Sequence, residues 1–461
     1  MKRVVVLNVV GLTRSVIGEH TPRIRAFVES GQLSSFKPAF PAVTCTAQSS
    51  YVTGLSEAGH GVVANGWYDR EAAEVKFWKQ SNHIVQGEKI WEVLRRDLPG
   101  FTCAKLFWWY NMYSTADWTI TPRPMYPADG RKVFDVYTQP MGMREEVKAD
   151  LGAFPFPTFW GPNASIPCSE WIAESAKWVE AKHEPTLSLV YLPHLDYGLQ
   201  KYGPGASEMD AELEAIDRVV GDLIDYFEQR DVEVVLLSEY GISRVDKPVH
   251  LNRLFREKGW ITIKEELGTE MLDCGASRVF AVADHQVAHV YLNDQSLLEE
   301  VQQLLMETDG VEEVRLGSEA FGKNGKGHER AGDLVAVSDE NAWFTYYYWL
   351  DDAVAPDFAR CVDIHRKPGY DPVELFLDPE IAAPKLKIGS FLLKKKLGFR
   401  ALLDVIPLDA SLVKGSHGRD QVSEDEQPIF VTRERHEALG GAEDVFSRIC
   451  ALVKARELGE K

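Results

Sequence analysis

Cysteine motifs, long apolar runs and positive charge are what this sequence has little of. Its cysteines are Cys45, Cys103, Cys168, Cys274, Cys361 and Cys450, and they form no Cys-x-x-Cys pair. Neither a zinc knot nor a disulfide framework is indicated, so we expect reduced thiols in a cytoplasmic compartment. No stretch reaches the roughly 18 uninterrupted apolar residues of a membrane span. The sequence therefore predicts a chain without a transmembrane segment.

Acidic residues outnumber basic ones, 70 to 51, and the formal net charge is −19. This excess argues against non-specific binding to nucleic acid. It would also repel an anionic substrate, unless a metal ion or a local basic patch reverses the field at the site. The one basic run is 391–400, with Lys394, Lys395 and Lys396, and we expect it to be a solvated helix end.

The 461 residues exceed one simple core and suggest a large domain with a smaller one. The first 13 residues, MKRVVVLNVVGLT, invite comparison with a secretory signal. However, Asn8 and Gly11 interrupt the apolar run and no small-residue cleavage site follows. A buried first strand from Val4 to Val10 fits the pattern better.

Valine-rich and leucine-rich runs at 4–10, 187–192 and 232–237 predict strands of a parallel sheet that is covered on both faces. Thr21 and Pro22 predict a helix start, with Thr21 as N-cap and the helix ending near Ser30. An amphipathic pattern predicts a long helix over 207–230. The strand-helix-strand order between 187 and 237 is typical of a parallel crossover. We therefore predict an α/β fold, with a mainly parallel sheet flanked by helices.

Two further segments differ from this pattern. Residues 100–163 are dense in aromatics and proline, and we expect a packed insertion over the site rather than a sheet element. From 278 onward, strands over 287–292 and 311–316 with a helix over 296–308 predict a smaller α+β unit. The expected organisation is a core of 1–277 and 355–461, and a second unit of 278–354.

Polar side chains follow several of the predicted strands, where ligands of open parallel sheets bind. Asn8 ends the first strand, His194 and Asp196 follow the second, and Glu239 follows the third. His417 precedes another short strand at 428–431. Each residue alone is more simply a helix cap or a surface hydrogen-bonding group, but together they indicate one site.

Three motifs near the N-terminus carry a family resemblance: Phe40-Pro41-Ala42-Val43-Thr44, then Val52-Thr53-Gly54-Leu55, then His60-Gly61-Val62-Val63-Ala64-Asn65. Later segments that support it are Asp196 with Gly203-Pro204, Ser238-Glu239-Tyr240-Gly241, His328 to Val337, and Gly415-Ser416-His417-Gly418. The chain resembles the type I phosphodiesterase/nucleotide pyrophosphatase branch of the alkaline phosphatase superfamily over most of its length. The resemblance implies an alkaline-phosphatase-like core with a smaller cap domain.

The resemblance also implies a mechanism with two metal ions, usually zinc, in which a metal-activated Thr44 hydroxyl attacks phosphorus and forms a covalent intermediate. Cys45 could compete as a nucleophile, but we expect it to be a small buried residue. Asn65 and His194 are the candidates for substrate binding. The candidate metal ligands are Asn8, Thr44, Asp196, Gln200, Glu239, Tyr240, His365 and His417.

Several of these positions depart from the family pattern. Asn8 stands where the family has Asp, Gln200 where it has His, Glu239-Tyr240 where it has Asp-His, and Ala47 where it has Asn. Oxygen donors favour Mg, Ca or Mn over zinc. We therefore expect a divalent-metal site (Zn, Mn, Mg or Ca, with one or two ions), and our hypothesis is fewer metals or one oxygen-ligated ion. His194 and His365 rank above His285 as further ligands, because Asp196 and Asp363 stand beside them.

Three functions remain open from the sequence. The first is a metal-dependent phosphoric-ester hydrolase, in particular a phosphodiesterase, acting on a small phosphorylated or anionic substrate under an aromatic roof. The second is a catalytically weakened relative that binds a phosphorylated or isoprenoid-type molecule. The third is a phosphomutase or sulfatase-like enzyme, although Cys45-Thr46-Ala47-Gln48-Ser49 lacks the sulfatase Cys/Ser-x-Pro-x-Arg context. A homodimer is compatible with all three.

Overall fold

The computed structural model describes residues 1–129, 131–322, 327–399 and 401–455. Its centre is an eight-stranded sheet of order β2-β20-β9-β1-β8-β5-β6-β7. Neighbours from β9 to β6 are parallel, whereas β20 and β7 pair antiparallel. The strands are β1 (Val4–Val9), β2 (Gln32–Ser35), β5 (Cys103–Leu106), β6 (Trp118–Pro122), β7 (Val136–Gln139), β8 (Leu187–Leu192), β9 (Glu233–Leu237) and β20 (Ile429–Thr432).

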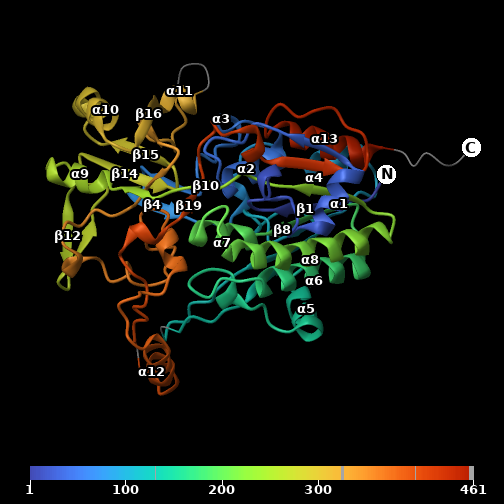
Figure 1. The fold of residues 1–461 in the computed structure, drawn as a ribbon, viewed down its shortest axis with the longest axis horizontal. Coiled ribbons are helices and arrows are strands. Elements are labelled where there is room, and N and C mark those ends of the chain that lie inside the picture. Colours follow the sequence, from blue (N-terminus) through green and yellow to red (C-terminus); the bar gives the residue numbers. More distant parts are fainter. Residues whose placement is uncertain (130, 323–326, 400, 456–461) are drawn as a thin grey trace, which may run out of the picture.

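Helices cover both faces of this sheet (Figure 1). Because side chains alternate along a strand, Val5 and Leu7 of β1 face one apolar cluster and Val4 and Val6 face another. The first face is covered by α1 (Pro22–Ser30), α6 (Pro167–His183) and α8 (Glu208–Glu228). The second is covered by α2 (Thr44–Thr53), α4 (Ile90–Asp97) and α13 (Asp444–Lys454). By the same alternation Asn8 lies on the face of α2.

A separate four-stranded antiparallel sheet has the order β14-β15-β17-β16 and lies at the left of Figure 1. Its strands are β14 (Val279–Asp284), β15 (Val287–Leu292), β16 (Val311–Leu316) and β17 (Leu334–Ser338). β14 and β15 form a hairpin in which Asp284 pairs with Val287, so that His285 and Gln286 are the two turn residues. His285 has φ +61°, a conformation that tight turns require.

Short elements complete the structure. The remaining helices are α3 (Glu57–His60), α5 (Met143–Leu151), α7 (His194–Tyr202), α9 (Leu251–Glu257), α10 (Leu298–Glu307), α11 (Gly317–Ala320) and α12 (Pro384–Lys396). The remaining strands form the pairs β3 (Gly66–Asp69) with β4 (Glu74–Phe77), β10 (Ser243–Arg244) with β19 (Gly415–Ser416), β11 (Lys247–Val249) with β18 (Ala342–Phe344), and β12 (Ile263–Glu266) with β13 (Thr269–Leu272).

The predicted α/β class with a mostly parallel sheet is confirmed. β8 and β9 both pair with β1 in parallel, and α8 connects them, as the crossover pattern predicts. β15, α10 and β16 also form as predicted, with β17 between the two strands. The division into a core of 1–277 with 355–461 and a unit of 278–354 stays a prediction.

The interpretation of 100–163 as an insertion outside the sheet is wrong in one respect. This segment supplies β5, β6 and β7, which together form one edge of the central sheet. The pattern of β5 was hidden because Lys105, a charged residue, lies in the middle of a buried four-residue strand. Its ammonium is accommodated because it donates to the carbonyl oxygens of Trp109 and Tyr110, each at 2.8 Å.

The predicted start of α1 is correct, but the capping group is not Thr21. The Thr21 hydroxyl interacts with Gly18, outside the helix. The first-turn amides of Arg23 and Ile24 instead donate to the carboxylate of Asp217 on α8, at 3.1 and 2.8 Å. A side chain from another helix therefore caps α1, which local sequence rules cannot anticipate.

The basic run at 391–400 forms the exposed end of α12, as expected, except for Arg400, which lies outside the described residues. In the described part of the chain, none of the helices combines the length and apolar character needed to cross a bilayer. The six cysteines, all within the described ranges, are buried and unpaired.

Candidate active site

Thr44 is the first residue of α2, and the loop before it is held by the segment that carries His417. The Ala42 amide donates to the Gly418 carbonyl at 2.9 Å, and His417 Nδ1 donates to the Ala42 carbonyl at 2.7 Å. Thr44 is 4% exposed. Its Oγ1 lies 3.0 Å from the Tyr240 hydroxyl. Two arms of a buried polar network meet at this side chain.

Glu239 forms the first arm. Its Oε1 accepts from the side-chain amides of Asn8 at 2.5 Å and Gln48 at 2.6 Å. Burial raises the pKa of Glu239 to about 8, and hydrogen bonds from Gln48, Asn8 and Thr44 act in the opposite direction. Gln48 stands four residues after Thr44, so the same face of α2 presents both side chains.

Asp196 forms the second arm. The Tyr240 hydroxyl donates to Asp196 Oδ1 at 3.3 Å, and Gln200 Nε2 donates to Oδ2 at 2.8 Å. The Tyr370 hydroxyl in turn donates to Gln200 Oε1 at 2.9 Å. Burial raises the pKa of Asp196 to about 7, while hydrogen bonds from Tyr240 and Gln200 favour its ionised form. Asp196 is therefore able to hold or release a proton near neutral pH.

A stack of rings closes the site on the side of the small sheet. The ring centroids of Tyr240 and His417 lie 3.7 Å apart, His417 and His285 3.7 Å, and His285 and Tyr370 3.6 Å. Burial lowers the pKa of both histidines well below the usual value, so both rings are neutral. The β14–β15 hairpin thereby contributes directly to the site.

Asn65 joins this hairpin to the first turn of α2. Its backbone and side-chain amides donate to Asp284 at 2.7 and 3.1 Å, and its Oδ1 accepts from the Cys45 amide at 3.0 Å. Cys45 itself is buried, and burial raises its pKa well above the usual value, which fits the expectation of a small packed residue. The backbone N–H and the side-chain amide of Asn65 thus both form hydrogen bonds with protein groups.

The structure brings together most of the residues that the sequence singles out. The residues joined in one network around Thr44 are Asn8, Asp196, Gln200, Glu239, Tyr240 and His417. Asn8 lies in β1, Asp196 and Gln200 lie on α7, and the others follow β9 and β19. They meet because the parallel strands end at one edge of the sheet.

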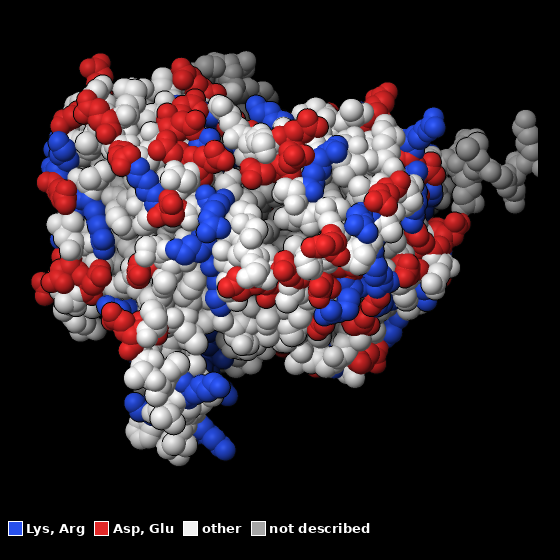
Figure 2. Space-filling model, in the orientation of Figure 1, with Lys and Arg blue, Asp and Glu red and all other residues white. Residues whose placement is uncertain are grey.

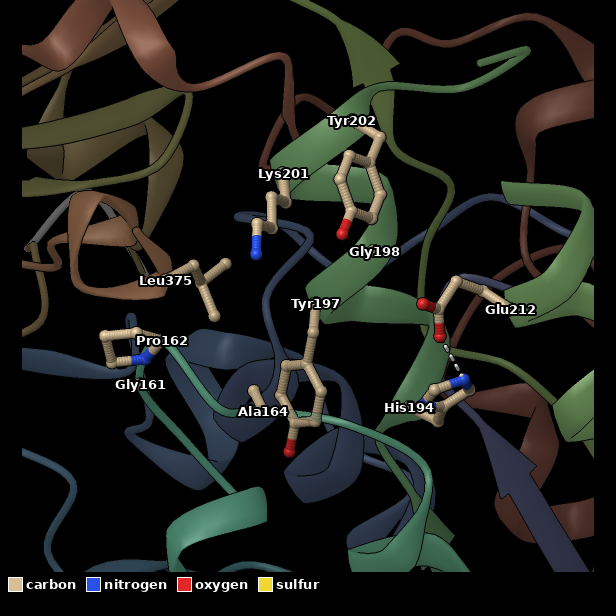
Figure 3. Close-up of a pocket in the computed structure, with 10 residues that line it drawn as sticks. All are labelled: Gly161, Pro162, Ala164, His194, Tyr197, Gly198, Lys201, Tyr202, Glu212 and Leu375. Carbon is tan, nitrogen blue, oxygen red and sulfur yellow. Dashed lines mark ion pairs between the residues drawn. The ribbon is translucent and has the colours of Figure 1, made fainter. Parts of the chain in front are cut away.

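His194 does not join this network in the described contacts. It lies two residues before Asp196 on α7, so its side chain leaves another face of the helix. Its Nε2 forms an ion pair with Glu212 of α8 at 2.7 Å, beside a cavity of about 20 Å³ (Figure 3). That volume holds a single water molecule rather than a substrate.

His365 also stands apart from Thr44 in the described contacts. It is exposed, and its side chain lies against the backbone of Phe77. His285, which the sequence ranks below His365, contacts the His417 ring, and the role of either histidine as a ligand stays a prediction. His285 and Asp284 belong to the site, and their position at a two-residue hairpin turn was the signal that could have found them.

Two other members of the network were missed. Gln48 could have been found from its spacing of one helical turn from Thr44. Tyr370 gave no local signal, because its contact with Gln200 joins residues 170 positions apart.

Comparisons with known proteins agree with this architecture. The family described as type I phosphodiesterase / nucleotide pyrophosphatase matches residues 4–371. The chain therefore belongs to the type I phosphodiesterase/nucleotide pyrophosphatase family, whose members include phosphoric-ester hydrolases.

Two curated relatives illustrate the distance. A pyrophosphatase/phosphodiesterase of Schizosaccharomyces pombe is 26% identical over 245 residues, covering 51% of this chain and 42% of the relative. The human bis(5'-adenosyl)-triphosphatase of the same family is 24% identical over 238 residues, covering 50% and 45%. The matched part spans less than half the length of these relatives.

Solved structures share the fold. Murine ectonucleotide pyrophosphatase/phosphodiesterase 5 in complex with AMP has a TM-score of 0.59 at 15% identity, covering 100% of this chain and 97% of that one. Phosphonoacetate hydrolase from Sinorhizobium meliloti 1021 has a TM-score of 0.61 at 15% identity, covering 98% and 96%.

Proposed function

We propose that this protein is a phosphoric-ester hydrolase of the phosphodiesterase or nucleotide pyrophosphatase type, with Thr44 as the covalent nucleophile. The observation that carries the proposal is the contact of Thr44 Oγ1 with Tyr240, whose hydroxyl is bound to Asp196. A threonine hydroxyl attacks phosphorus only when its proton has somewhere to go. Here the Thr44 proton passes to the Tyr240 oxygen while Tyr240 gives its own proton to Asp196.

The covalent step balances within this set of groups. Thr44 Oγ1 forms a bond to phosphorus, the bond to the leaving oxygen breaks, and Asp196 holds the proton. Asp196 returns this proton through Tyr240 to the leaving oxygen, which departs as an alcohol. A water oxygen then bonds to phosphorus as the bond to Thr44 Oγ1 breaks, and one proton of that water returns to Thr44. The first turn of α2 carries backbone N–H groups and the positive end of the helix dipole, which favour an anionic phosphoryl group at Thr44.

The metal positions of the family are only partly suited to ions in this chain. Among the described residues, no three or more His, Cys, Asp or Glu side chains form a group that could hold a metal ion, and zinc sites are built mainly from such ligands. Burial raises the pKa of the Tyr240 phenol well above its usual value, so it remains protonated and is a poor ligand. These residues therefore do not fit a pair of zinc ions.

One oxygen-ligated ion fits better. Asn8 Oδ1 and Glu239 Oε2 are buried and have no hydrogen-bond partner within the described residues. Together with Thr44, these oxygens match the hard donors that Mg, Mn or Ca accept. Such an ion, when bound, supplies a positive charge that lowers the pKa of a coordinated hydroxyl.

The substrate is a small phosphorylated or otherwise anionic molecule. The aromatic loop 108–110 meets α2 through the Trp109 amide, which donates to Gln48 at 2.7 Å, and this supports an apolar leaving group. Asn65 orients the first turn of α2. Cytoplasmic location and a homodimer stay predictions.

A pair of substitutions at Thr44 tests the proposal. Thr44→Ala is expected to reduce hydrolysis of a chromogenic phosphodiester by at least ~1000-fold, because the nucleophile is lost. Thr44→Ser keeps a hydroxyl and is expected to retain measurable turnover. Steady-state kinetics with matched thermal unfolding checks both variants. Full activity of a folded Thr44→Ala protein would refute a role for Thr44 as nucleophile.

The alternative, a catalytically weakened binder of phosphorylated or isoprenoid-type molecules, is not favoured by the family match or by relatives that are named as hydrolases. One feature would suit it: the side-chain amides of Asn8 and Gln48 already donate hydrogen bonds to Glu239. A panel of esters and anhydrides assayed with Mn, Mg, Ca and Zn separates the two. Binding without turnover across the panel would favour this candidate over the hydrolase.

A further inference from the structure

Helix α12 projects from the body of the molecule at the lower left of Figure 1. Every residue of this 13-residue helix is exposed or half-buried. Helices in globular proteins are normally stabilised by burying one face against a core. A projecting helix with this degree of exposure therefore has a face available to something outside the chain.

The charge of this segment is opposite to that of the protein. Residues 381–403 contain six Lys or Arg and no Asp or Glu, whereas the whole chain carries −19. In Figure 2 the projection is white and blue, while red side chains are spread over the body. The lysines of α12 include Lys394, Lys395 and Lys396 at its C-terminal end.

Large apolar side chains share the same surface. Leu386, Leu393 and Leu397 follow each other at spacings of seven and four, so they form one stripe. Their exposed fractions are 76%, 58% and 65%. Leu392 and Phe399 add further exposed apolar surface near the same end, at 57% and 64%. Such a concentration of exposed apolar groups marks an interaction surface rather than scattered surface residues.

We propose that α12 is a membrane-surface anchor that inserts its leucines into the interface of a bilayer rich in anionic lipid. Leucine and phenylalanine stabilise an interfacial helix by burial at the boundary of headgroups and acyl chains. The lysine side chains extend toward the headgroups and bind their negative charge. The helix is too short to span a bilayer, so it lies at the surface.

Charge complementarity favours an anionic lipid surface, because α12 is basic and extends beyond the body. The acidic body would be repelled by the same surface, so the contact would be confined to α12. A second copy of this chain is the competing occupant, since its acidic surface would also attract the lysines. Lipid is preferred because a bilayer accepts apolar side chains on several sides of a helix, as in α12, without a matching groove.

Flotation of the full chain with vesicles tests the anchor. The probe is phosphatidylcholine vesicles with and without about one third phosphatidylserine. Binding to the anionic vesicles is expected to exceed binding to neutral ones by at least ~10-fold and to weaken with added salt. A combined Lys394→Ala, Lys395→Ala, Lys396→Ala variant is expected to lose on the order of 100-fold in affinity. A Leu393→Ser, Leu397→Ser variant is expected to lose at least ~10-fold.

The control removes the same charge elsewhere, in a combined Lys37→Ala, Lys258→Ala, Lys264→Ala variant, and should bind as the wild type does. Thermal unfolding should be unchanged in the α12 variants because α12 buries little. Equal binding to both vesicle types, or loss of binding in the control variant, would overturn the proposal. So would absence of vesicle binding together with a dimer, seen by light scattering, that the leucine substitutions dissociate.

Discussion

At the scale of single residues, the site differs from the family pattern at positions where an amide stands in place of a carboxylate or an imidazole. An amide at Asn8 replaces an expected carboxylate and donates to Glu239. An amide at Gln200 replaces an expected imidazole and donates to Asp196. Each amide thus donates to a carboxylate of the network around Thr44. The exchanges leave Thr44 in place but change what surrounds it.

Metal content follows from these donor types. We expect protein purified without added salts to contain at most one divalent ion per chain, and to prefer Mn or Mg over zinc. Glu239→Ala is expected to lower that content, because it removes the carboxylate oxygen that has no protein partner. His365→Ala is the matched control and should leave it unchanged. Inductively coupled plasma mass spectrometry measures the content, and two zinc ions per chain would contradict this reading of the site.

At the scale of elements, neighbouring structures complete what a local sequence leaves open. α1 depends on α8 for its cap, and β5 depends on the loop after it for the hydrogen bonds of Lys105. The β14–β15 hairpin places its turn against His417. The cap and the hairpin contact join residues far apart in sequence, whereas Lys105 donates to carbonyl oxygens only four and five residues later.

Stability should reveal the cap between α1 and α8. Asp217→Ala is expected to lower the free energy of unfolding by about 2 kcal/mol, because two first-turn amides lose their acceptor. Asp217→Asn keeps one acceptor oxygen and should lose roughly half as much. Urea unfolding followed by circular dichroism measures both. Equal stability of Asp217→Ala and the wild type would show that water caps α1 as well as Asp217 does.

At the scale of the whole molecule, a buried acid and a buried base change the pH dependence of stability in opposite directions. Burial raises the pKa of Glu239 from 4.5 to about 8 and lowers that of Lys105 from 10.5 to about 7. Between pH 7 and 8 the folded state holds a proton on Glu239 that the unfolded chain lacks, so this group destabilises the fold as pH rises. Lys105 acts in reverse, because only the unfolded chain is fully protonated there.

Two variants should therefore change the slope of stability against pH in opposite directions. Measured with a chelator between pH 7 and 8, Glu239→Gln is expected to make stability rise with pH relative to the wild type. Lys105→Met should make it fall. Each slope is limited to ~1.4 kcal/mol per pH unit, the value for one proton. Chemical unfolding across this range provides the measurement. Parallel profiles for all three proteins would exclude opposite contributions of Glu239 and Lys105 to the pH dependence of stability.

The sequence by itself determined the local elements and the family. The apolar runs of β1, β8 and β9 and the periodicity of α8 are local signals, and the motifs around Thr44 are contiguous. Local signals survive without the rest of the chain, because they reflect which side chains can be covered by a layer of protein. They also placed Asn8, Asp196, Glu239 and His417 near one edge of a sheet.

Only the tertiary structure determined which residues from distant segments contact one another. It placed β5 in the sheet despite Lys105, brought His285 and Tyr370 into the site, and directed His194 toward Glu212 instead of Thr44. It also left α12 without a protein partner on its leucine stripe, although its pattern of leucine and lysine would equally suit a packed helix. The reason is physical: hydrogen bonds and packing between distant segments depend on the directions of side chains, which the spacing of residues along one segment does not fix.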